Sequence, residues 1–183
     1  IMVDTTVTGF VHFLESHPTT LKKAEDYFAE NKIDHEVMLS QRLYPNMLAL
    51  TRQVQIATDA AKGAGARLTG TANPSFPDEE KTFEELQARI AKTTAYLESM
   101  TREQFTGAEA RDISFQAGQR EINMKGAAYL ETWAKPNFFF HVTTAYNILR
   151  HNGLDIGKPD YLSGGNHVLP TGGLAGACGP LGV

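Results

Sequence analysis

The chain of 183 residues is 42% hydrophobic and carries 17 basic against 21 acidic residues, a net charge of −4, which is typical of a globular domain. This balance provides no basic surface for nucleic acid or anionic lipid, so neither partner is expected. Cys178 is the single cysteine, so the chain cannot form an intramolecular disulfide. The sequence has neither an apolar run of membrane length nor a secretory signal pattern. From these features we expect a cytoplasmic protein.

Two helical segments are expected in the first third of the chain. Hydrophobic residues recur at helical spacing over residues 5–31, where Pro18 should kink or split the helix. The spacing returns over residues 34–62, most strongly over 46–62, and the glycines that follow should loosen the helix end. One face of this second helix is polar and is expected to lie in water; it carries Arg52, Gln55, Asp59 and Lys62.

Gln53 is the exception in this second helix, because it falls inside the broad apolar arc. A buried amide without hydrogen-bond partners costs about 2–7 kcal/mol. We therefore interpret Gln53 as a structural hydrogen-bonding residue, with a role in a site as the alternative.

The middle of the chain is predicted to contain a loop, a third helix and a β-hairpin. The loop covers residues 69–80 and ends in Asp78, Glu79 and Glu80, which read as a solvated charge run. A third helix is expected over about residues 81–100. Residues 111–124 alternate between apolar and polar types and are interrupted by an Ala-Gly pair, which predicts a short hairpin.

The last helix is expected to begin at Pro136 and to end at Gly153, after a shorter helical pattern over residues 127–134. Four long helical segments and one hairpin predict an all-α fold, a four-helix bundle with a small β-hairpin before the last helix. The Gly-rich residues 163–183 show no periodicity, so we expect a flexible tail after a domain that covers residues 1–162.

Asn137 and His141 lie four residues apart on this last helix, at the edge of its apolar stripe, so their side chains share a face. His141 has two interpretations. It is either a core histidine satisfied by Asn137, Thr144 or a facing helix, or a general acid/base in a pocket. The residues alone favour the structural interpretation.

A second face of the last helix, opposite the apolar stripe, carries Phe139, Tyr146 and Arg150. These side chains are either half-buried against a neighbouring segment or part of a dimer surface, since aromatic residues and arginine are enriched at interfaces.

Three blocks of sequence are distinctive: residues 43–57, which begin Leu-Tyr-Pro-Asn-Met; residues 82–90; and residues 136–153, which begin Pro-Asn-Phe-Phe-Phe-His-Val-Thr-Thr-Ala-Tyr and end Ile-Leu-Arg-His-Asn-Gly. Together they resemble the DinB/YfiT-like superfamily, and within it a branch of unknown function, over roughly residues 5–162. The resemblance implies a helical bundle that is often a homodimer. Many members hold a divalent metal with three histidines, one on the second helix and two in a His-x-x-x-His on the last.

The sequence departs from that metal site. His141 matches the second histidine of the pair, Asn137 stands in place of the first, and Gln53 takes the place of the third. Amide oxygens are poor ligands for transition metals. No cofactor is therefore expected, although a weakly bound divalent metal at His141 stays open, and we interpret the trio as a polar cluster around a neutral His141. Because this position faces the ligand cavity in relatives, the resemblance brings the two interpretations of His141 near parity.

Two functional hypotheses follow from the resemblance. The first is an enzyme, a small-molecule transferase or isomerase with a pocket between helices two and four. His141 and Asn137 would be catalytic, Gln53 and Thr144 would bind the ligand, and a thiol such as glutathione would be a cosubstrate by analogy alone. The alternative is a non-catalytic small-molecule-binding or stress-associated bundle, which an inert, buried His141 without a cavity would favour.

Overall fold

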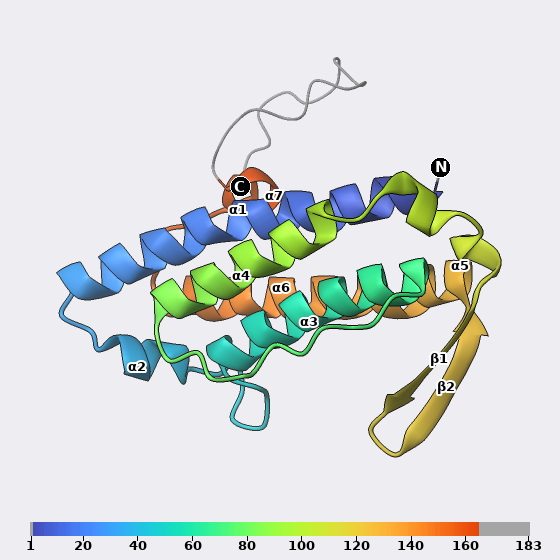
Figure 1. The fold of residues 1–183 in the computed structure, drawn as a ribbon. Helices are drawn as coiled ribbons and strands as arrows, with labels where there is room; N and C mark the ends of the chain where they lie inside the picture. The colour runs from blue at the N-terminus through green and yellow to red at the C-terminus, as the bar shows by residue number, and fades with distance from the viewer. Residues whose placement is uncertain (1, 165–183) are drawn as a thin grey trace.

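Four long helices make up most of the structure, a computed structural model that describes residues 2–164. They are α1 (Met2–Glu30), α3 (Leu50–Thr69), α4 (Phe83–Glu98) and α6 (Lys135–His151). The first helix packs along α4, and α3 packs along both α4 and α6 (Figure 1). The core between them is built from large apolar side chains that are almost fully buried, among them Phe10, Phe28, Phe83, Leu86 and Phe138. The predicted helical fold is confirmed.

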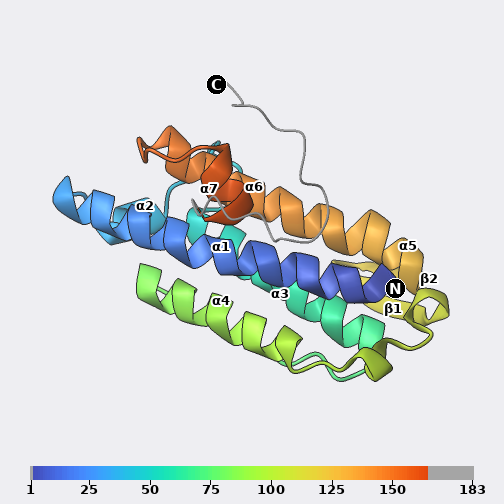
Figure 2. The same cartoon turned by 90° about the horizontal axis from the view of Figure 1, so that it is seen from above.

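Short elements connect and cover these helices. They are α2 (His35–Leu39), the 3₁₀ turns η1 (Arg102–Phe105) and η2 (Ala108–Ala110), β1 (Asp112–Ala117), β2 (Arg120–Lys125), α5 (Gly126–Tyr129), the π-helical turn η3 (Leu130–Ala134) and α7 (Lys158–Ser163). The predicted hairpin is present: its two strands are antiparallel, and Gly118 at the turn has a φ of +62°. The hairpin extends from the end of the molecule where α5 lies, while α7 packs on α1 (Figures 1 and 2).

The first helix is continuous through Pro18, so the expected split does not occur. Leu14 and Leu21 on either side of the proline are both buried in the core, and this packing offsets the loss of one backbone hydrogen bond. Near the proline, the carbonyl of Phe13 accepts hydrogen bonds from the side chains of Ser16 and His17, at 2.8 and 2.5 Å.

The third helix continues through Gly63 and Gly65 to Thr69, against the expectation that these glycines loosen its end. A Cβ atom at Gly65 would lie 2.8 Å from Cδ2 of Leu97 and 2.7 Å from Cε of Met100. The missing side chain therefore lets the end of α4 approach α3 closely, and this packing outweighs the low helix propensity of glycine.

Pro136 does not begin a new helix, because α5, η3 and α6 follow one another without a break over residues 126–151. The proline lies in the first turn of α6, directly after the π-helical turn Leu130–Ala134. Gly153 follows the helix with a φ of +97°, which agrees with its predicted role as the residue that ends it.

The second face of α6 packs against other segments of the same chain. The ring of Phe139 lies 4.9 Å from that of Phe13 on α1, and the ring of Tyr146 lies 5.8 Å from that of Tyr161 on α7. The Tyr146 hydroxyl donates to the carbonyl of Ile156. Of the two interpretations of this face, half-burial against a neighbouring segment is the one that these contacts support.

The expected flexible tail over residues 163–183 lies, from residue 165 onward, outside the described residues. Within residues 2–164, no helix combines the length and the apolar character that crossing a bilayer would take.

Candidate functional site

The seam between α3 and α6 brings two of the predicted site residues into contact. Nδ1 of His141 lies 2.7 Å from Oε1 of Gln53, and Nε2 of Gln53 donates to the carbonyl of Leu48 at 3.0 Å. Because the amide nitrogen of Gln53 faces a carbonyl, its oxygen must accept the bond from His141, which assigns the proton of the neutral imidazole to Nδ1. Only 9% of His141 and 1% of Gln53 is exposed. The predicted structural role of Gln53 agrees with these contacts.

His141 is neutral at pH 7. Burial lowers the pKa of its imidazole, and the positive charge of Arg52 lowers the pKa further. The ring lines a cavity of only about 10 Å³, which it shares with Gln53, with Leu14 and His17 of α1, and with Ile90 of α4. A cavity of this size is at the lower limit for one water molecule, so it has no room for a substrate.

Asn137 and Thr144 do not join this pair. The sequence left Asn137, Thr144 or a facing helix open as the partner of His141, and the facing helix α3 supplies it. The bond between Asn137 and His141 that the polar cluster would require does not form. Nδ2 of Asn137 donates to the carbonyl of Trp133 at 3.0 Å, and the hydroxyl of Thr144 donates to the carbonyl of Phe140 at 2.7 Å. Both bonds run four residues back along the same helix, as short polar side chains in helices often do. The expected contact is therefore wrong, because the helix's own carbonyls take these side chains.

Asn137 instead lines a larger cavity further along the same seam, with a volume of about 180 Å³. We call it the seam pocket. It is lined from α3 and from the segment 129–137 that enters α6: Ile56, Asp59, Ala60, Arg67, Tyr129, Trp133, Ala134 and Asn137. The π-helical turn Leu130–Ala134 forms part of this wall, and such turns occur often at functional sites.

Arg67 is the charged group at the α5 end of the seam pocket. Its Nη1 donates to the hydroxyl of Tyr129 at 3.1 Å, and its guanidinium lies 4.7 Å from the ring centre of Phe115 and 5.7 Å from that of Tyr129. Burial raises the pKa of Tyr129 although the charge of Arg67 opposes this, so the phenol stays protonated. Among the described residues, no carboxylate lies within ion-pair distance of Arg67.

Sequence reasoning missed Arg67, Tyr129 and Trp133 as site residues. One signal was available for Arg67: it follows Gln53 by 14 residues, almost four helical turns, and so shares the face of α3 that Gln53 occupies. Tyr129 and Trp133 precede the predicted start of the last helix, and only the continuous helical segment carries them to the same seam.

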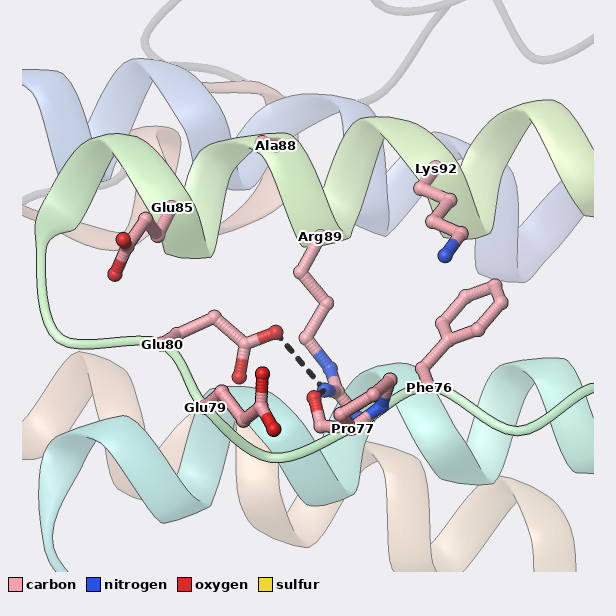
Figure 3. Close-up of a pocket in the computed structure, with 8 residues that line it drawn as sticks. All are labelled: Phe76, Pro77, Glu79, Glu80, Glu85, Ala88, Arg89 and Lys92. Atoms are coloured by element: carbon pink, nitrogen blue, oxygen red, sulfur yellow. Dashed lines mark hydrogen bonds and ion pairs between the residues drawn. The ribbon is translucent and has the colours of Figure 1, made fainter.

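A second and larger hollow, of about 330 Å³, lies outside the helices between α4 and the loop over residues 70–82. We call it the outer pocket. Arg89 reaches from α4 towards this loop and donates to the carbonyl of Pro77 at 2.9 Å and to Glu80 at 3.0 Å (Figure 3). The same guanidinium donates to Thr58 and pairs with Asp59 and Asp78, each within 3.0 Å. The single positive charge of Arg89 is thus paired with three carboxylates, and two of them, Asp78 and Glu80, belong to the loop, so this cluster fastens the loop to the helices.

The loop over residues 70–82 corrects two predictions about polar residues. Glu80 belongs to the predicted solvated run, yet only 14% of its side chain is exposed and it pairs with Arg89. Gln55 and Lys62, expected in water, are buried. Both corrections have the same physical reason, which is that the loop lies across the polar face of α3. Gln55 on this face donates to Glu80 of the loop, and the ammonium of Lys62 lies 4.4 Å from the ring centre of Phe76 in the loop.

Comparison with known proteins shows the family. The family model for a domain of unknown function, DUF1993, matches residues 2–162. The chain belongs to the DUF1993 family. It is also similar to a DinB family member protein from Shewanella denitrificans, whose crystal structure it matches with a TM-score of 0.85 at 39% identity, over 94% of this chain and 96% of that one. The DinB-like assignment and fold are thus confirmed. None of the curated proteins compared with the chain matches it.

In this DUF1993 protein, the three residues that the resemblance would place at the superfamily's metal positions, Gln53, Asn137 and His141, do not form a ligand set. Gln53 Oε1 already accepts a bond from His141, and Asn137 is turned towards its own helix. Over the described part of the chain, no three His, Cys, Asp or Glu side chains gather closely enough to hold one metal ion. The donors at these positions do not fit a three-histidine metal centre.

Proposed function

We propose that this DUF1993 protein binds a small molecule in the seam pocket, in a non-catalytic role. The observation that carries the proposal is the seam pocket itself: a cavity of about 180 Å³ between α3 and α6, lined by the predicted site residue Asn137 together with aromatic and small side chains. Cavities that hold drug-sized ligands measure about 300–1,000 Å³. The ligand is accordingly small.

The environment of His141 favours binding over catalysis. A general base must lie within hydrogen-bond reach of the proton that it removes. His141 is fixed by Gln53 and borders a cavity of about 10 Å³, and it lies one helical turn from Asn137 in the seam pocket. The transferase or isomerase hypothesis, its thiol cosubstrate and the homodimer stay predictions.

Filling the seam pocket tests the proposal. Trp133 is the single tryptophan of the chain and lines the seam pocket, so its fluorescence reports occupancy. We expect fragments from a library of small molecules to change this fluorescence in the wild-type protein and to lose binding at least tenfold in Ala60→Leu, whose longer side chain occupies the cavity. Protein-observed NMR on the same samples identifies the residues whose signals shift.

The matched control makes the same exchange in the outer pocket. Ala88 is an exposed residue of α4 that lines the outer pocket, so Ala88→Leu adds the same bulk without touching the seam. Fragment binding should be unchanged in this variant. Binding that survives Ala60→Leu but is lost in Ala88→Leu would overturn the proposal and would assign the ligand to the outer pocket instead.

A further inference from the structure

We propose that the seam pocket is a binding site for a small monocarboxylate, which Arg67 recognises through its guanidinium. This inference rests on the proposed binding function and adds the chemical class of the ligand. It arises from the different surroundings of two arginines that reach into the interior of the protein, Arg67 and Arg89.

Arg89 shows how this fold neutralises a buried guanidinium. Its side chain is 2% exposed and meets the carboxylates of Asp59, Asp78 and Glu80, each at 3.0 Å. A charge removed from water is normally paired in this way. Arg67 is half-buried, yet its contacts among the described residues are the neutral phenol of Tyr129 and two aromatic faces. A bound carboxylate would supply the missing partner.

The guanidinium of Arg67 is held in place before any ligand arrives. One N–H donates to Tyr129 and the plane lies against the ring of Phe115, while Gly63, one turn earlier on α3, leaves the room that the guanidinium occupies. Arginine carries five N–H donors in a fixed fork that matches the two oxygens of a carboxylate. Since the Tyr129 oxygen accepts from Arg67, its proton stays available as a further donor beside the same group.

The rest of the seam pocket limits the size and charge of the ligand. Its walls between the charged residues are apolar or aromatic, from Ile56, Ala60 and Trp133. Asp59 lines it from eight residues earlier on α3, about 12 Å away along the helix. The positive charges of Lys62 and Arg89 are already paired with this carboxylate, at 2.9 and 3.0 Å. Neither cation is therefore available to a second anionic group of a ligand. A compact body with one carboxylate fits; a polyanion does not.

Benzoate and its neutral analogue benzamide test this inference directly. They have the same ring and nearly the same shape, and they differ in the charge that Arg67 would recognise. We expect benzoate to bind the wild-type protein at least tenfold more tightly than benzamide, with Trp133 fluorescence and NMR shifts as readouts. Inorganic phosphate should bind more weakly than benzoate, because it cannot use the apolar walls.

Three variants test the positive charge of Arg67 separately from the position of its guanidinium. Arg67→Met should remove the preference for benzoate, while Arg120→Met, at an exposed site beside the hairpin turn, should keep it. Gly63→Ala leaves every charge in place, but its methyl group would overlap Nη1 of Arg67 and displace the guanidinium. We expect this variant to fold normally, as measured by circular dichroism, and to bind benzoate about tenfold more weakly.

The outcomes also separate this inference from the proposed function. Equal binding of benzoate and benzamide in the seam, or a benzoate preference that survives Arg67→Met, would overturn the role of Arg67 and leave the seam pocket standing. Phosphate binding as tight as benzoate binding would overturn the choice of a carboxylate. If neither compound binds and no fragment responds to Ala60→Leu, both proposals fail.

Discussion

Nδ1 of His141 on α6 lies 2.7 Å from Oε1 of Gln53 on α3, and Nε2 of the same Gln53 side chain donates a hydrogen bond to the carbonyl of Leu48 in the preceding loop. The first bond joins two helices whose residues are 88 positions apart in the sequence, and the second ties the start of α3 to the loop just before it. A fully satisfied buried polar network rigidifies the packing around it. One turn further along the seam lies the seam pocket, so this network fixes the spacing of the two helices that line it.

Replacing Gln53 by leucine should lower the free energy of unfolding by about 1–3 kcal/mol. The side chain keeps a similar size, but the N–H of His141 and the carbonyl of Leu48 lose their partner while they stay buried. Urea unfolding followed by circular dichroism measures the change. Gln116→Leu, on an exposed position of β1, is the control and should change stability by less than about 0.5 kcal/mol. An unchanged free energy for the Gln53 variant would contradict this account of the seam.

Stability should fall as the pH is lowered below about 6.5, the ordinary pKa of histidine. Burial lowers the pKa of His141, and burial also lowers that of His17 against the opposing hydrogen bond to Phe13. Below about pH 6.5 the unfolded chain therefore binds more protons than the folded one, so each histidine removes at most about 1.4 kcal/mol per pH unit until its folded-state pKa is reached.

Urea unfolding between pH 7.5 and 5.0 measures this effect, and the Glu80 carboxyl that pairs with Arg89 stays ionised in this range. Burial would raise the pKa of Glu80, but its bonds from Arg89 and Gln55 outweigh this and lower it. We expect His141→Gln to reduce the slope of stability against pH, and His151→Gln, at the exposed end of α6, to leave it unchanged. Equal slopes in all three proteins would show that His141 does not titrate as its burial implies.

The sequence predicted the elements of the fold well, since local patterns determine them. Helical spacing located the long helices, alternation located the hairpin, and Gly153 ended α6 with a positive φ as expected. Gln53 was identified as a buried hydrogen-bonding residue because it interrupts an apolar arc, and His141 was identified at the edge of the apolar stripe of the last helix. The resemblance then placed the two in one polar cluster, in which they do form a bond. These inferences depend on one helix at a time.

The errors came from contacts between distant segments. The polar face of α3 was expected in water, but the loop over residues 70–82 covers it and buries Gln55 and Lys62. Arg67 shares a face with Gln53, but periodicity within α3 could not show that no carboxylate of residues 2–164 pairs with it, because that depends on what the other helices and the hairpin place nearby. Helical periodicity gives the direction of a side chain and does not say what lies opposite.

The glycines of two helices should respond to alanine with opposite signs. Gly9 on α1 has no atom within 4 Å of the place where a Cβ would stand, so Gly9→Ala should stabilise the protein by about 0.5–1 kcal/mol. At Gly65 the same methyl group would meet Leu97 and Met100 at 2.7–2.9 Å. Overpacking there should destabilise the protein by about 1–3 kcal/mol. Thermal unfolding of the pair checks both signs, and stabilisation by both variants would mean that α3 and α4 are not in close contact.

Replacing Arg89 by methionine should be the most destabilising of these changes, at about 3–5 kcal/mol. The variant leaves the carboxylates of Asp59, Asp78 and Glu80 close together without the cation that they share. Repulsion should release the loop over residues 70–82, which Arg89 also holds through the carbonyl of Pro77.

Two measurements distinguish loss of the loop from general unfolding. Urea unfolding gives the free energy, and limited proteolysis with trypsin at native pH reports access to Lys81, the one basic residue of the loop. We expect cleavage after Lys81 to be at least tenfold faster in Arg89→Met than in the wild-type protein, with the helical circular dichroism signal retained. Arg120→Met controls for the loss of a surface charge. Cleavage at the wild-type rate would mean that the loop is held by its apolar contacts, such as Phe76 against Lys62 and Lys92, without need of Arg89.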